Sequence, residues 1–251
     1  MTRRLLSLLL VLLLLPVVSM ADPLPLLEDY AEDLVIPYDE QDPSAGIFRY
    51  SYRYPHVDEE AEGGSEINAF YTELITYLTG FTIPMIQDAF EGMDSSETVT
   101  YTVTCNNDDF FSVLVRTEKN NPDQHLVLWE GHVFSRKEGA PGLTFTLPKV
   151  LGILSSDESE EWLQNRQTEK ANKLIREMVW DMIEENEEGR DYGDLTEEIL
   201  SYIFFPEENF YLDENGDPVF YLQPSDVLYE LPENASLYTF PIALEDILDE
   251  L

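Results

Sequence analysis

The sequence predicts an α+β protein in which helices pack on a largely antiparallel sheet, followed by a C-terminal hairpin and a terminal helix. Residues 99–134 alternate apolar and polar side chains in successive runs separated by Asn- and Asp-containing turns, which indicates an antiparallel meander. Residues 163–183 repeat apolar side chains at helical spacing, and residues 209–251 combine aromatic strands, an Asn-Gly turn and an amphipathic helix. Strands and helices in separate runs of the chain are typical of the α+β class.

The first 21 residues have the pattern of a secretory signal peptide. Two arginines precede an apolar run at 5–15, which is followed by Pro16 and is short for a membrane span. Ser19 and Ala21 are the small residues expected before a cleavage site between Ala21 and Asp22. We expect cleavage there, no membrane span after it, and a secreted or cell-envelope protein. An uncleaved N-terminal anchor is the alternative.

An acidic segment with four prolines follows at 22–46, and we expect it to be a linker leading into one α+β domain at 47–251. Residues 47–54 then alternate strictly, which predicts a half-buried strand. Phe48, Tyr50, Tyr52 and Tyr54 share one face of this strand. We interpret the row as the cover of a core, with a stacking platform for a sugar or a base as the alternative.

Two helices are predicted before the meander. Ser65 is expected to cap the first, Gly80 to end it, and Pro84 to begin the second. Within the meander, Gly131 predicts a bulge. The single cysteine, Cys105, excludes an intramolecular disulfide and is expected to be a buried structural thiol.

A short strand and two helices are predicted after the meander. The strand contains Leu143, Phe145 and Leu147, and the long helix runs through 163–183. Asp194 and Glu197 are expected to cap a short helix beyond it.

The C-terminal stretch begins with a predicted hairpin. Asn215-Gly216 favours positive φ at both turn residues. Asp213, Asn215 and Asp217 also resemble the start of a calcium loop, but Pro218 stands where that loop needs glycine. We therefore interpret the segment as a plain turn. A strand at 237–240 follows, and then a helix whose apolar face is formed by Leu244, Ile247, Leu248 and Leu251.

The charge of the chain limits its partners. It has 51 acidic and 14 basic residues and a formal net charge of −37. This charge disfavours nucleic acid and anionic membranes, and it favours cationic partners. The alternative is an acidic surface that is merely solvated.

No catalytic or metal-binding motif stands out. His56, His125 and His132 lack the close spacing of a zinc site, and the sequence has neither a nucleophile elbow nor a phosphate-binding loop. We therefore expect no catalytic residue, no metal, no cofactor and no enzyme activity. The binding residues are left unassigned.

The order of features resembles a bacterial extracellular domain. A strand ends in Tyr54-Pro55, a helix opens with Ile67-Asn68, a Thr-rich meander follows, and the chain closes on NFYLDENGDPVFYLQPSDV and LYTFPIALEDIL. Over about residues 47–251 this is similar to the domain shared by RsiV-type anti-sigma factors and PdaC-like polysaccharide deacetylases. The closing motif departs from the usual form at Pro224-Ser225, where the family has Pro-Tyr.

The resemblance implies a binding function rather than a catalytic one. In the anti-sigma members the domain lies outside the cell and binds lysozyme, and in the deacetylases a separate metal-dependent domain is catalytic. We therefore expect a non-catalytic binding module for a cationic protein, with lysozyme as the candidate. A cell-envelope structural or cation-binding domain is the alternative, and a cell-wall hydrolase using two carboxylates is less favoured.

Overall fold

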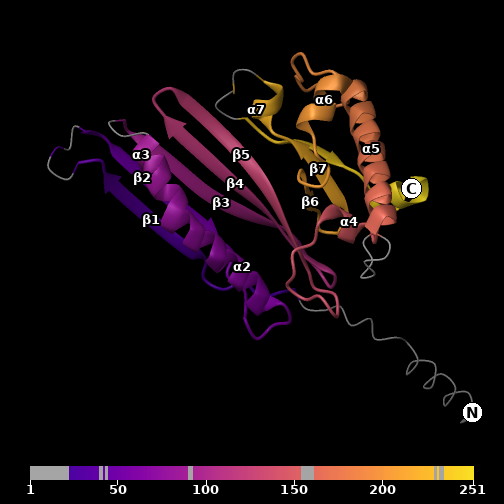
Figure 1. Cartoon of the computed structure of the whole chain (residues 1–251), viewed down its shortest axis with the longest axis horizontal. Helices are drawn as coiled ribbons and strands as arrows, with labels where there is room; N and C mark the ends of the chain where they lie inside the picture. The colour runs from indigo at the N-terminus through magenta and orange to yellow at the C-terminus, as the bar shows by residue number, and fades with distance from the viewer. Residues whose placement is uncertain are drawn as a thin grey trace, which may run out of the picture.

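The computed structural model describes residues 23–39, 42, 45–89, 93–153, 161–228, 231 and 235–251. In this part of the chain a five-stranded sheet and a three-stranded sheet pack together, with helices on their outer sides (Figure 1). The α+β prediction is confirmed. The signal segment, with its cleavage between Ala21 and Asp22, lies outside the described residues.

The five-stranded sheet has the order β1–β2–β3–β4–β5. Its strands are β1 (Tyr30–Pro37), β2 (Ile47–Tyr54), β3 (Ser95–Asn106), β4 (Phe110–Asn121) and β5 (Gln124–Ser135). Neighbours are antiparallel except β2 and β3, which are parallel. A parallel pair needs a crossover, and the helices between β2 and β3 supply it. The predicted meander corresponds to β3, β4 and β5.

Strand β1 corrects the prediction that residues 22–46 form a linker. It pairs with β2 along its whole length, from Tyr30 opposite Tyr54 to Pro37 opposite Ile47. Upstream of it, Leu24 is buried and its backbone bonds to the side chain of Asn106. Acidic residues and proline are tolerated here because β1 is an edge strand, where charges and a missing N–H do little harm.

Three helical segments cross one face of this sheet as a continuous run: α2 (Gly64–Tyr77), the π-helical turn η2 (Leu78–Thr82) and α3 (Ile83–Ala89). Two predicted boundaries are wrong. Ser65 lies inside α2, whose N-cap is Gly63 with a φ of 82°. Gly80 lies within η2 and does not end the helix.

The tyrosine row of β2 faces these helices and covers a core, as predicted. Phe48 and Tyr50 are each 1% exposed, and Tyr54 lies against Tyr71 of α2 with ring centroids 5.6 Å apart. The row is therefore closed off, so the stacking-platform interpretation is wrong.

Two predictions near the end of the meander are also wrong. Gly131 pairs with Leu114 in an uninterrupted register, and the irregularity lies instead between Val103 and Cys105. The predicted strand at 143–147 reduces to an isolated bridge between Phe134 and Thr144, followed by α4 (Leu147–Val150).

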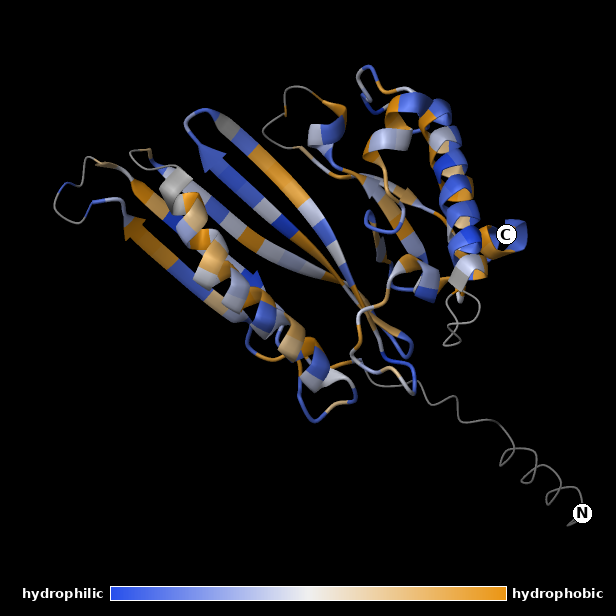
Figure 2. Ribbon diagram, viewed as in Figure 1, coloured by the Kyte–Doolittle hydropathy of each residue, from blue (hydrophilic) through white to orange (hydrophobic). Residues whose placement is uncertain are grey.

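The C-terminal half forms the three-stranded sheet, in the order β6–β7–β8, and the helices that cover it. Its strands are β6 (Phe210–Leu212), β7 (Pro218–Leu222) and β8 (Tyr238–Pro241), and its helices are α5 (Glu161–Glu185), α6 (Glu197–Ile203), α7 (Pro224–Val227) and α8 (Leu244–Glu250). The hairpin, the strand and the terminal helix are as predicted. Figure 2 shows that the outward side of α5 is mostly hydrophilic, while its inward residues Ala171, Ile175, Val179 and Ile183 are buried.

Two local predictions in this half are corrected. Thr196 caps α6 by accepting a hydrogen bond from the backbone N–H of Ile199, so Asp194 and Glu197 do not cap it together. In the hairpin turn only Gly216 has positive φ, and Asn215 does not. The loop between β6 and β7 spans residues 213–217, which is longer than the two-residue turn that Asn-Gly favours.

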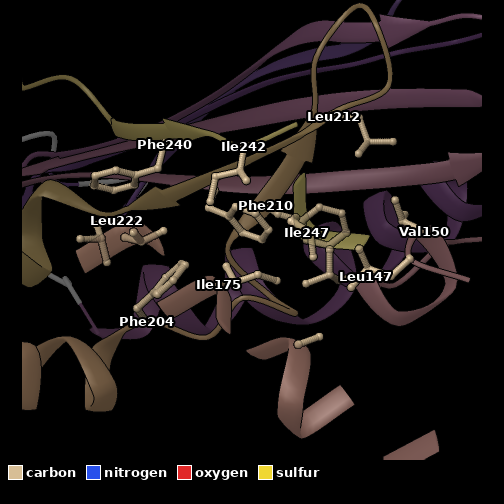
Figure 3. Packing of buried hydrophobic residues seen from close by; sticks show 14 of the residues in the cluster. Leu147, Val150, Ile175, Phe204, Phe210, Leu212, Leu222, Phe240, Ile242 and Ile247 are labelled. Atoms are coloured by element: carbon tan, nitrogen blue, oxygen red, sulfur yellow. The ribbon is translucent and has the colours of Figure 1, made fainter. Parts of the chain in front are cut away.

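The two halves share one of their two cores. Phe204, Phe210, Leu222 and Ile175 converge in it (Figure 3). Cys105 of β3, 1% exposed, belongs to the same cluster, which confirms its buried position. Because strands β3, β4 and β5 contribute to this core, the C-terminal half depends on the first sheet for burial.

Candidate functional site

A groove of about 730 Å³ follows strand β5, between the α2–η2 run and the C-terminal half. Its helical wall is formed by Phe70, Leu78 and Thr82. The remaining lining comes from both sheets and from the segments before α4, before β6 and after β7. Its charged and polar members include Glu97, Lys119, Glu130, His132, Glu207, Glu208, Tyr221 and Gln223. Pockets of this size at the junction of two structural units are typical of binding sites.

The groove wall opposite α2 belongs to the C-terminal half. Its side chains bond the backbone of β5 along the edge where the sheet has no further strand. Gln223 accepts a hydrogen bond from the backbone N–H of Trp129 at 3.0 Å and donates one to its carbonyl at 2.6 Å. The hydroxyl of Tyr221 accepts one from the N–H of Gly131 at 3.2 Å. Tyr221 lies in β7 and Gln223 directly follows that strand, so folding of the three-stranded sheet defines the groove.

Glycine is required at 131 because the backbone of β6 crosses it. A Cβ atom at this position would lie 1.9 Å from the carbonyl oxygen of Phe210, far inside van der Waals contact. The signal read in the sequence as a bulge is therefore a close approach of two backbones.

The most buried charge in the groove is Glu97, whose side chain is 6% exposed. Burial raises the pKa of its carboxyl group, and Lys119, with its Nζ 3.3 Å from Oε2, opposes the rise. The two residues are direct partners across β3 and β4. Lys119 is 39% exposed, so its ammonium group reaches the solvent.

A second polar chain runs from the core to the groove surface. The hydroxyl of buried Tyr71 lies 3.3 Å from His132 Nδ1, and His132 Nε2 lies 3.3 Å from Glu130 Oε1. The hydrogen bond from His132 lowers the pKa of Glu130, while burial raises that of Tyr71 well above 10.0. Glu130 is 75% exposed, so this chain ends at a carboxylate that a partner can reach.

Glu97 and Glu130 do not have the spacing of a hydrolase pair. Glu97 and Glu130 have pKa values shifted in opposite directions. However, they lie two strands and four ladder positions apart, which puts their Cα atoms about 16 Å from each other. Glycosidase carboxylates lie within about 10 Å.

Acidic side chains predominate in the lining of the groove. Its lining contains four glutamates, Glu97, Glu130, Glu207 and Glu208, against one lysine, Lys119, and one histidine. Lys119 pairs with Glu97 and His132 contacts Glu130, so the lining contains more acidic than basic side chains. A groove with this charge attracts a cationic group.

The residues considered in the sequence for metal binding lie apart. His56 stacks on Tyr30, and His125 contacts Glu118, 3.3 Å away. The carboxylate of Asp213 accepts hydrogen bonds from the backbone N–H groups of Asn215 and Asp217, which is the behaviour of a plain turn. Of the described residues, no three or more His, Cys, Asp or Glu side chains are grouped so that they could hold a metal.

The groove residues were missed in the sequence for an identifiable reason. The strand was predicted to begin at Val99, but β3 begins at Ser95. Extending the alternation by two positions places Glu97 on the same face as Val99, which would have marked it as a buried acid. Glu130 and His132 share a face of β5 for the same reason.

Structural comparison identifies the fold. The structure is similar to that of a member of the DUF3298 family from Bacteroides fragilis NCTC 9343, with a TM-score of 0.53, 10% sequence identity, and coverage of 90% of this chain and 94% of that one. A second DUF3298 family protein, from Pseudomonas aeruginosa PAO1, has a TM-score of 0.46, 11% identity and coverage of 91% and 94%. At the identity of the first comparison the likeness shows the fold alone.

The sequence comparisons found nothing further: no family model matches the chain, and no curated protein matches it significantly. None of the described helices is both long enough and apolar enough to cross a membrane.

Proposed function

We propose that this protein is a non-catalytic binding module of the cell envelope or the extracellular space, and that its groove binds a basic protein. One observation carries the proposal: the groove along β5 is lined by four glutamates and a single lysine, which is itself paired with Glu97. A chain of net charge −37 would also steer a basic partner towards it.

Lysozyme is the first partner to test. The support is the similarity of the closing stretch to the RsiV-type domain, together with the acidic groove. The pattern of the first 21 residues supports export.

The test is calorimetric titration of residues 22–251 with lysozyme at about 0.15 M salt, where exposed charges are largely screened. A second basic protein of similar charge serves as the control. We expect a one-to-one complex with lysozyme and none with the control. Equal weak binding to both would mean that net charge alone is acting, and lysozyme would then be abandoned as the partner.

Paired variants locate the interface. Replacing Glu130 and Glu208 by glutamine removes two charges from the groove, whereas replacing Glu184 and Glu185 removes the same charge from the exposed end of α5, outside the groove lining. We expect the first pair to weaken binding about tenfold or more and the second to have little effect. Equal effects from the two pairs would argue against the groove.

A further inference from the structure

An exposed apolar ridge lies on the helical run α2–η2–α3, which also contributes one wall of the groove. It consists of Tyr77, Phe81 and Met85, which are spaced four residues apart and are 58%, 55% and 55% exposed. The rings of Tyr77 and Phe81 contact each other, with centroids 5.3 Å apart. Single exposed apolar residues are ordinary, but contiguous ones mark interaction sites.

The ridge adjoins the groove. Phe70 of α2 lines the groove and packs on His132 with ring centroids 5.1 Å apart. Tyr77 follows Phe70 by seven residues, which is two helical turns, so the two side chains leave α2 on the same side. Leu78 and Thr82 adjoin Tyr77 and Phe81 in the chain and line the groove themselves.

The backbone under the ridge is unusual. Residues Leu78–Thr82 form a π-helical turn, a form that is rare in proteins and frequent at functional sites. Gly80 lies in this turn with open space where a Cβ atom would project, so the described chain leaves room beside the ridge.

The net charge of the protein indicates which kind of partner binds to the ridge. Two copies of a chain with net charge −37 repel each other, which disfavours self-association through this face. The ridge residues are chain neighbours of Leu78 and Thr82, which line a groove that favours a cation, and aromatic residues and methionine are enriched in the centres of interfaces.

We propose that the ridge and the groove form one binding surface, and that it takes an amphipathic basic segment of the partner protein. In this arrangement the segment's apolar side chains pack on Tyr77, Phe81 and Met85, and one of its lysines or arginines enters the groove beside Glu130 and Glu208. The inference rests on the proposed function for the groove and adds the apolar half of the partner's surface.

Two synthetic peptides of equal length and charge test the inference on residues 22–251. One is an amphipathic Leu–Lys helix, and in the other every leucine is replaced by serine. Affinity is measured by fluorescence anisotropy at about 0.15 M salt. We expect the Leu–Lys peptide to bind about tenfold tighter or more, because burial of apolar surface adds to the charge attraction.

Protein variants show where the difference arises. Tyr77→Ser combined with Phe81→Ser is expected to abolish the advantage of the Leu–Lys peptide while leaving the Ser–Lys affinity unchanged. Tyr202→Ser, at a position on α6 that is 71% exposed and outside the groove lining, is the matched control and is expected to change neither. Circular dichroism confirms that each variant is folded.

The outcomes separate the two proposals. Equal binding of both peptides, weakened by Glu130→Gln with Glu208→Gln, would overturn the ridge and leave the acidic groove in place. An advantage for Leu–Lys that survives in the ridge variant would also overturn the ridge. Absence of binding by either peptide would overturn both proposals.

Discussion

The side-chain amide of Gln223 bonds both the N–H and the C=O of Trp129, as a neighbouring strand would. The same arrangement recurs in the described chain, where an Asn side-chain amide bonds both the N–H and the C=O of one other residue. The other pairs are Asn68 with Val57, Asn106 with Leu24, and Asn186 with Arg190. These amides satisfy backbone groups that lie at a sheet edge or outside the regular elements.

Replacing Gln223 by leucine is expected to lower the free energy of unfolding by about 2 kcal/mol, because the N–H of Trp129 loses its side-chain acceptor and its C=O keeps only the longer bond from the Tyr221 hydroxyl. Urea denaturation measures the change. Gln167→Leu, on the exposed surface of α5, is the matched control and should stay within about 0.5 kcal/mol of the parent. If the two variants were equally stable, the Gln223 pairing would not hold the C-terminal half on β5.

Replacing Asn68 by alanine is expected to be more damaging, at about 3 kcal/mol, because Val57 is fully buried and water cannot reach its unpaired groups. Asn68→Asp keeps the acceptor for the N–H of Val57, and in its protonated form its single O–H replaces the amide donor to the carbonyl with a less favourable geometry. Thermal denaturation at a pH where the aspartic acid is protonated should therefore place this variant between the parent and Asn68→Ala. An alanine variant as stable as the parent would contradict the assignment.

Gly131 and Gly80 give opposite expectations for the same substitution. Gly131→Ala forces a methyl group against the carbonyl of Phe210 and should cost about 3 kcal/mol as β6 moves away. Gly80→Ala meets nothing within 4 Å and should stabilise the helical run by about 0.5–1 kcal/mol. Chemical denaturation of the two variants compares them directly, and equal effects would mean that β6 does not cross β5 closely.

Periodicity in the sequence predicted the meander and the long helix because each buries one face of a regular element, whereas the Asn215-Gly216 turn predicted the C-terminal hairpin. It missed β1, since an edge strand exposes most of its side chains and carries Glu32, Asp33 and Pro37 without penalty. It also misread Gly80 and Gly131. Glycine is a local stop or bulge signal in the sequence, whereas the role of Gly131 depends on a strand about 80 residues away in the chain.

The sequence predicted some properties of the groove but not its position. The net charge indicated a cationic partner, and the exposed carboxylates follow from composition. The position of the groove depends on how β7 docks against β5 through Gln223 and Tyr221, a contact between segments about 90 residues apart. Such a contact has no local signature, so the sequence could not bring Glu97, Glu130 and Glu208 into one site.

Glu97 pairs with Lys119 across the strands, and Glu118 precedes Lys119 in β4. We expect their contributions to the stability of the protein to change with pH in opposite directions. Burial raises the pKa of Glu97, so the native state binds its proton more tightly than the unfolded state does. Its contribution to stability therefore falls as the pH rises from the ordinary value of 4.5 through the raised native pKa. Hydrogen bonding to Arg116, 2.8 Å away, lowers the pKa of Glu118, whose stabilisation is present above the ordinary value and is lost as the pH falls.

Glutamine variants of these two residues separate the effects. Relative to the parent, Glu97→Gln should gain stability between pH 4 and pH 7, because the amide carries no charge to bury and Lys119 remains solvated. Glu118→Gln should lose stability over the same interval. Differences from the parent at each pH, measured by urea denaturation, cancel the general repulsion of a chain with net charge −37. Curves of the same sign for both variants would show that Glu97 is stabilised by Lys119 more than it is penalised by burial, and the groove would then hold a firmly ionised carboxylate at its base.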